Sequence, residues 1–84
     1  MGMYKKNAAF PIPESDPYRM NLVLLRKKHG YTQSELAEKL GTSQTMYARY
    51  ERGANELPIH HLILLAKIYG VSTDQILGLE KDRP

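Results

Sequence analysis

The sequence predicts an all-α fold, a compact bundle of five short helices preceded by an irregular N-terminal arm. Three observations predict this class. Apolar residues recur at helical spacing in several segments, capping residues and glycines mark the ends of those segments, and no segment alternates as a strand would. With 84 residues, the chain is long enough for one small domain with a single core.

The first two helices have clear start and stop signals. Asp16 is a suitable N-cap, Pro17 is tolerated at the first helical position, and Gly30 ends the first helix. The second helix opens with a capping box in which Thr32 and Glu35 satisfy each other's backbone donors. Its apolar residues fall on one face, which we expect to be buried: Leu36, Ala37 and Leu40.

The third helix is expected over residues 44–52, between the N-cap Ser43 and the terminating Gly53. At about 100° per residue, Tyr47, Tyr50 and Glu51 fall on the inner side. The opposite face carries small, polar and cationic residues: Thr45, Ala48, Arg49 and Arg52. We therefore expect one buried aromatic face and one outward cationic face.

Two further helices complete the bundle. The fourth begins at Pro58 or Ile59 and ends at Gly70, and the fifth opens with a second capping box of Ser72 and Gln75. Two apolar residues of the fourth helix lie outside its main apolar stripe, Leu64 and Ile68. They are expected to contact either a second subunit or the N-terminal arm.

Residues 1–14 form the predicted arm, because they lack a helical period and contain the stretch FPIP. The arm is expected to be flexible or loosely docked, residues 15–79 to form the domain, and residues 80–84 to form a C-terminal tail. Two functions are open to the arm, namely phosphate contacts by Tyr4, Lys5 and Lys6 or cover for the core by Phe10 and Ile12.

The composition argues against several classes of protein. The absence of cysteine excludes disulfide scaffolds, thiol nucleophiles and cysteine-based zinc sites. His60 and His61 are adjacent and diverge on a helix, so we expect no metal site. No catalytic constellation or phosphate-binding loop is present, so neither an enzyme nor a cofactor is expected.

Without a signal peptide or a membrane-length apolar run, the protein is expected in the cytoplasm. The net charge of +3 permits an anionic partner.

A three-residue break, residues 41–43, joins the second and third helices, and such a tight link makes two helices cross steeply. The run TQSELAEKLGTSQTMYARYERG that contains it, followed downstream by LP and YGVSTDQILG, resembles the Xre-type helix-turn-helix proteins, the class of Cro and the phage repressors. The resemblance covers about residues 18–79. It implies a lambda-repressor-like fold with its helix-turn-helix unit at about residues 32–52.

The resemblance also implies roles for individual residues. It implies base contacts in the major groove for Gln44, Thr45 and Arg49. It implies contacts to the DNA backbone for Gln33, Ser43, Arg52 and Tyr47. It implies a structural ion pair between Arg26 and Glu51. Taken without the resemblance, the polar residues of the second and third helices would be interpreted as caps and solvated side chains. Tyr47 and Met46 depart from the family pattern, which has smaller side chains there.

The resulting hypothesis is a sequence-specific transcriptional regulator, a repressor that binds double-stranded DNA as a homodimer. It would recognise a two-fold operator with half-sites about 34 Å apart, in the bacterial or phage-infected cytoplasm and on the nucleoid when bound. One alternative is an antitoxin-like regulator whose main task is to bind a protein partner. A second alternative is a relic of the fold that no longer binds DNA.

Overall fold

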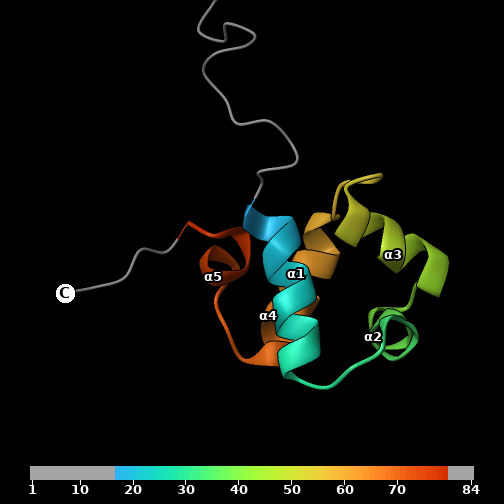
Figure 1. Ribbon diagram of the computed structural model, residues 1–84. Helices are drawn as coiled ribbons and strands as arrows, with labels where there is room; N and C mark the ends of the chain where they lie inside the picture. Colours follow the sequence, from blue (N-terminus) through green and yellow to red (C-terminus); the bar gives the residue numbers. More distant parts are fainter. Residues whose placement is uncertain (1–16, 80–84) are drawn as a thin grey trace, which may run out of the picture.

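The computed structural model describes residues 17–79, which form five helices and no strand (Figure 1). The helices are α1 (Pro17–Lys28), α2 (Gln33–Leu40), α3 (Gln44–Arg52), α4 (Ile59–Tyr69) and α5 (Thr73–Leu77). The predicted all-α fold is confirmed. The predictions for the arm (residues 1–14), for Asp16 and for the tail (residues 80–84) lie outside the described residues.

The helix starts follow the local signals in the sequence. In α2, the Thr32 hydroxyl accepts from the Glu35 backbone N–H at 3.0 Å, and the Glu35 carboxylate accepts from the Thr32 N–H at 2.9 Å. Ser72 and Gln75 form the same capping box at α5, with the same two distances. Both predicted capping boxes are therefore present. The fourth helix starts at Ile59, because Pro58 occupies the N-cap position in an extended conformation.

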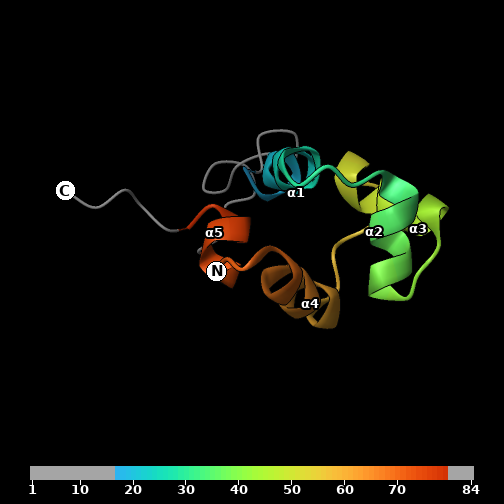
Figure 2. The ribbon, with the colours of Figure 1, turned by 90° about the horizontal axis from the view of Figure 1, so that it is seen from below.

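Gly41 sets the turn between α2 and α3. Its φ of 76° lies in the left-handed region, where a residue with a Cβ would be strained. The Thr42 N–H donates to the Ala37 carbonyl at 2.9 Å, which closes the end of α2. Ser43 then caps α3 by accepting the Met46 N–H at 3.0 Å. This compact turn fixes α3 against α2, and the two helices lie together at one end of the molecule (Figures 1 and 2).

The core lies between α1 and α4, with α2 and α3 at one end and α5 at the other (Figure 2). Its buried apolar side chains come from all five helices: Leu22, Leu36, Ala37, Leu40, Tyr47, Tyr50, Leu65, Tyr69 and Ile76. Ala48 differs from the prediction, since it is only 9% exposed although the wheel placed it outward.

The fourth helix leaves part of its apolar surface exposed. Ile59 and Ile63 are exposed one turn apart, and Leu64 is 37% exposed. Ile68 is half-buried and packs against the core. None of the helices in residues 17–79 is both long and apolar enough to cross a membrane.

Candidate nucleic-acid interface

The outward face of α3 carries the side chains for which base contacts were predicted. Gln44, Thr45 and Arg49 are all exposed, as is Arg52 at the end of the helix. Ser43 is exposed at the N-terminus of α3. The N-terminus of α2 lies nearby, because the Gln44 side chain donates to the Gln33 side chain at 2.8 Å. The two helices thus present one continuous polar surface to solvent.

Gln33 connects this surface to the interior. Its side-chain oxygen accepts from Gln44, and its side-chain nitrogen donates to Glu51 Oε1 at 2.9 Å. The Gln33 side chain is therefore already hydrogen-bonded within the protein. Its backbone N–H belongs to the first turn of α2, where amides have no acceptor within the helix and carry partial positive charge.

The predicted ion pair between Arg26 and Glu51 is present and links α1 to α3. Arg26 Nε lies 2.8 Å from Glu51 Oε2, and Arg26 Nη2 lies 3.1 Å from Oε1. The two side chains are 12% and 6% exposed. Burial alone would raise the pKa of Glu51, but hydrogen bonds from Arg26 and Gln33 outweigh it and lower that pKa. The pair thus fixes α3 in place through two charge-assisted hydrogen bonds.

The predicted contact of Tyr47 with the DNA backbone is wrong. Its side chain is 0% exposed and packs edge-on against Tyr50, with ring centroids 6.0 Å apart. Its hydroxyl has no hydrogen bond of normal geometry within residues 17–79. Burial, followed by the nearby Glu51 carboxylate, raises the pKa of that hydroxyl, which stays protonated. A phosphate could not reach this hydroxyl without opening the core, so Tyr47 is a packing residue.

Arg49 makes a contact that the sequence did not predict. Its Nε donates to Asn55 Oδ1 in the loop after α3, at 2.6 Å. The backbone N–H groups of Ala54 and Asn55 both donate to the Arg49 carbonyl, at 2.9 and 3.3 Å. The loop therefore contacts both the carbonyl and the guanidinium group of Arg49. Helical periodicity carries no information about loop residues, so no pattern in the sequence indicated Asn55.

Arg19 stabilises the C-terminal end of α3 from α1. Its Nη1 donates to the Arg52 carbonyl at 3.3 Å, where the last turn of the helix leaves carbonyls unpaired. Gly53 has a φ of 82°, and a Cβ at this position would overlap the Arg19 guanidinium. The positive φ thus favours glycine at this position, and any larger residue would also displace the Arg19 side chain.

His61 is a buried partner of Tyr50. Its Nδ1 lies 3.1 Å from the Tyr50 hydroxyl, which joins α3 to α4. Residues 17–79 contain no group of three or more side chains able to hold a metal ion. Burial, with a smaller contribution from the charge of His60, lowers the pKa of His61 below 6.5. The imidazole is therefore neutral in the folded protein near neutral pH.

Stability is expected to fall as the pH drops below about 7, because of His61. The unfolded chain takes up a proton near the ordinary pKa of 6.5, whereas the folded protein binds it only at lower pH. The stability that depends on a neutral His61 is thus fully present above the ordinary pKa of 6.5 and declines as the pH falls below it. Denaturant titrations between about pH 7 and about pH 5 should show this slope. His61→Gln should flatten the fall of stability with pH. An unchanged fall in this variant would show that His61 is not its cause.

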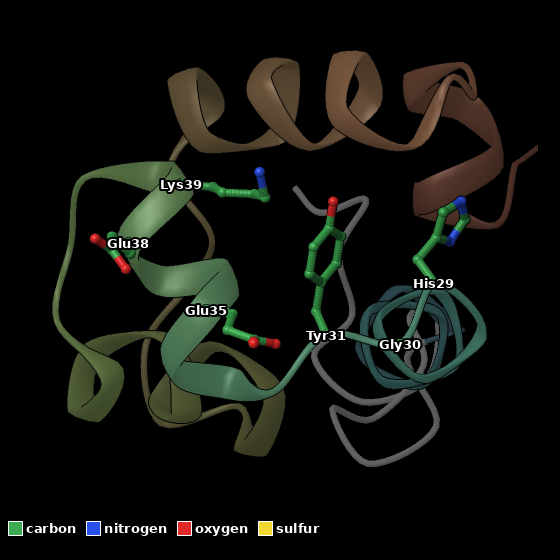
Figure 3. Close-up of a pocket in the computed structure, with 6 residues that line it drawn as sticks. All are labelled: His29, Gly30, Tyr31, Glu35, Glu38 and Lys39. Carbon is green, nitrogen blue, oxygen red and sulfur yellow. The ribbon is translucent and has the colours of Figure 1, made fainter.

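A surface hollow lies between the α1–α2 loop and α2 (Figure 3). Its lining residues are His29, Gly30, Tyr31, Glu35, Glu38 and Lys39. The side chains of Tyr31 and Lys39 project into the same space, with Lys39 Nζ 5.4 Å from the Tyr31 ring centroid. None of the predicted DNA-contacting residues lines this hollow, which is therefore separate from the candidate interface.

Comparison with known proteins identifies the family. A family model described as helix-turn-helix matches residues 22–76, more than half of the chain. The chain belongs to the Xre-type helix-turn-helix family. The matched region of this Xre-type domain begins within α1 and ends in α5, so it includes the whole α2–α3 unit. The predicted family is confirmed.

Relatives of this Xre-type domain are transcriptional regulators. The uncharacterized HTH-type transcriptional regulator YobD of Bacillus subtilis is 43% identical over 65 residues, which cover 77% of this chain and 58% of that protein. The crystal structure of a transcriptional regulator from Listeria innocua superposes with a TM-score of 0.71 at 30% identity, covering 79% of this chain and 62% of that one. The chain thus spans little more than half of these relatives. The printed names of these relatives are those of transcriptional regulators, which agrees with the expectation of a non-enzymatic protein.

A more distant relative bears on the antitoxin-like alternative. Antitoxin PezA of Streptococcus pneumoniae is 33% identical over 61 residues, which cover 73% of this Xre-type chain but only 39% of PezA. The match is thus confined to less than half of that antitoxin. It shows that the domain type also occurs in an antitoxin, without favouring that function for this chain.

Proposed function

We propose that this Xre-type domain acts as a sequence-specific transcriptional repressor that inserts α3 into the major groove of a two-fold operator. The observation that carries the proposal is the exposed polar face of α3, fixed to the core through Glu51. Gln44 and Thr45 at the start of α3 would contact base edges, together with Arg49. A short recognition helix brings its N-terminal residues deepest into the groove, which suits Gln44 and Thr45, whereas Arg49 would reach a base from the last turn through its long side chain.

The contacts to the DNA backbone are assigned to the residues that flank this face. The first-turn amides of α2, including that of Gln33, and the exposed Ser43 would donate to phosphates. The Arg52 side chain is exposed at the other end of α3 and would neutralise a phosphate charge. These contacts orient the domain, whereas the base contacts supply specificity.

A homodimer is the assembly that suits this proposal, because one domain of this size contacts only one half-site. Exposed apolar residues on α4 supply a surface for a second copy, chiefly Ile63 and Leu64. Ile68 packs against the core and would contribute at the edge. The proposed place of action is the cytoplasm, on the nucleoid when the protein is bound to DNA.

The proposal predicts strongly salt-dependent DNA binding. In fluorescence anisotropy titrations between about 50 and about 200 mM salt, log K should fall linearly with log salt concentration, by about 0.9 per phosphate neutralised. Arg52→Ala should reduce that slope by about 1. Lys67→Ala, which removes an exposed charge on α4, is the matched control and should leave the slope unchanged. Binding that is indifferent to salt would contradict the proposal.

The antitoxin-like alternative makes a different prediction. A regulator whose main task is to hold a protein partner should co-purify with that partner from its native host. The leading proposal instead requires that the isolated protein select a specific DNA sequence without any partner.

A further inference from the structure

We propose that Asn55 is a positioning residue that prepares the Arg49 side chain to recognise a guanine. This inference rests on the proposed function, in which α3 lies in the major groove. It adds a residue from the loop between α3 and α4 to the specificity determinants of the domain, although that residue itself need not touch a base.

The first support is the way in which Arg49 is held. A guanidinium group has an Nε–H on its side edge and two amino groups, Nη1 and Nη2, at its end. Asn55 Oδ1 accepts from Nε at 2.6 Å and so occupies the side edge. The end edge with its two amino groups remains available. That edge can donate two parallel hydrogen bonds to O6 and N7 of guanine, the commonest specific contact in the major groove.

The second support is that Asn55 is itself fixed in place. Its backbone N–H donates to the Arg49 carbonyl at 3.3 Å, beside the 2.9 Å bond from Ala54 to the same carbonyl. Gly53, with its φ of 82°, turns the chain so that these bonds can form. Asn55 is half-buried, while Arg49 is exposed. A fixed acceptor thus restrains a long side chain that would otherwise sample many rotamers in solvent.

The benefit of this restraint lies in conformational entropy. A free arginine side chain must be ordered when it binds, which lowers the affinity by about 2- to 10-fold. A side chain that already has its binding conformation avoids much of this loss. Asn55 should therefore strengthen binding to the operator with the correct base pair more than binding to an operator that lacks it.

The test is a double-mutant cycle on DNA. The wild-type protein first selects its operator from random DNA, and Arg49→Ala identifies the base pair at which discrimination disappears. Affinities are then measured for duplexes with and without that base pair, using the wild type, Asn55→Ala, Arg49→Ala and the double variant. Asn55→Ala should reduce discrimination at this position by about 2- to 10-fold. In the Arg49→Ala background, the same change should have no effect on discrimination or affinity.

The outcomes separate this inference from the proposed function. If the wild-type protein selects no sequence, the proposed function fails, and the inference fails with it. If the wild type discriminates and Asn55→Ala discriminates equally well, only the inference is overturned. An equal loss of affinity from Asn55→Ala in both backgrounds would also overturn it, because Asn55 would then contact a phosphate directly. Glu56→Gln, in the same loop, is the control and should preserve discrimination.

Discussion

Arg26→Ala is expected to lower the free energy of unfolding by about 3–5 kcal/mol, the larger of the two stability effects that we predict. The variant leaves Glu51, only 6% exposed, as a buried carboxylate without its cationic partner. Gln33 still donates one hydrogen bond to it, but a neutral amide does not balance the charge. Chemical denaturation followed by circular dichroism measures the loss, and neighbouring Lys27→Ala, an exposed position, should change stability by less than about 0.5 kcal/mol.

The pH dependence provides a check on this explanation. In the wild type, the pKa of Glu51 is lower in the folded protein than in the unfolded chain. The resulting stabilisation is fully present above the ordinary pKa of a glutamate, and it is lost as the pH falls through the lower, folded-state pKa. Without Arg26, burial becomes the dominant influence and raises the pKa of Glu51. The difference in stability between wild type and variant should therefore shrink as the pH is lowered. A difference that is small at neutral pH would show that the ion pair contributes little to stability. A large difference that does not shrink in acid would show that the loss comes from other contacts of Arg26 and not from the unpaired charge of Glu51.

Leu65→Ala is expected to destabilise the domain by about 2–5 kcal/mol. Leu65 is 0% exposed at the centre of the core, so its truncation removes apolar contacts and leaves a cavity that the short helices can close only in part. Leu64→Ala, the adjacent residue on the same helix, is the matched control because its side chain is 37% exposed. It should cost less than about 1 kcal/mol in dilute protein. Equal losses in the two variants would contradict the placement of α4.

The helix boundaries could be predicted because they depend on local interactions. Thr32 with Glu35, and Ser72 with Gln75, form capping boxes whose partners are three residues apart, so the sequence alone places them. Gly41 likewise ends its helix through its own backbone conformation. The ion pair of Arg26 and Glu51 was predicted by family resemblance, together with the need to balance a charge on the inner face of α3.

The remaining site features depend on tertiary contacts, which helical periodicity does not describe. Asn55 meets Arg49 only because the loop turns back over the end of α3. The contact between His61 and Tyr50 needs the packing of α4 beside α3. For Tyr47, the helical wheel indicates an inward position, whereas the family resemblance implies a contact with the DNA backbone, and the burial of its side chain decides against that contact.

The central claim is that exposed side chains of α3 contact bases in a two-fold operator. The most direct measurement is selection of bound duplexes from a random DNA pool, carried out in parallel with the wild-type protein and Arg49→Ala. We expect the wild type to enrich an inverted repeat with half-sites about 34 Å apart. The variant should lose the base preference at one position in each half-site. Failure of the wild type to enrich any sequence, or an identical motif from both proteins, would contradict the account.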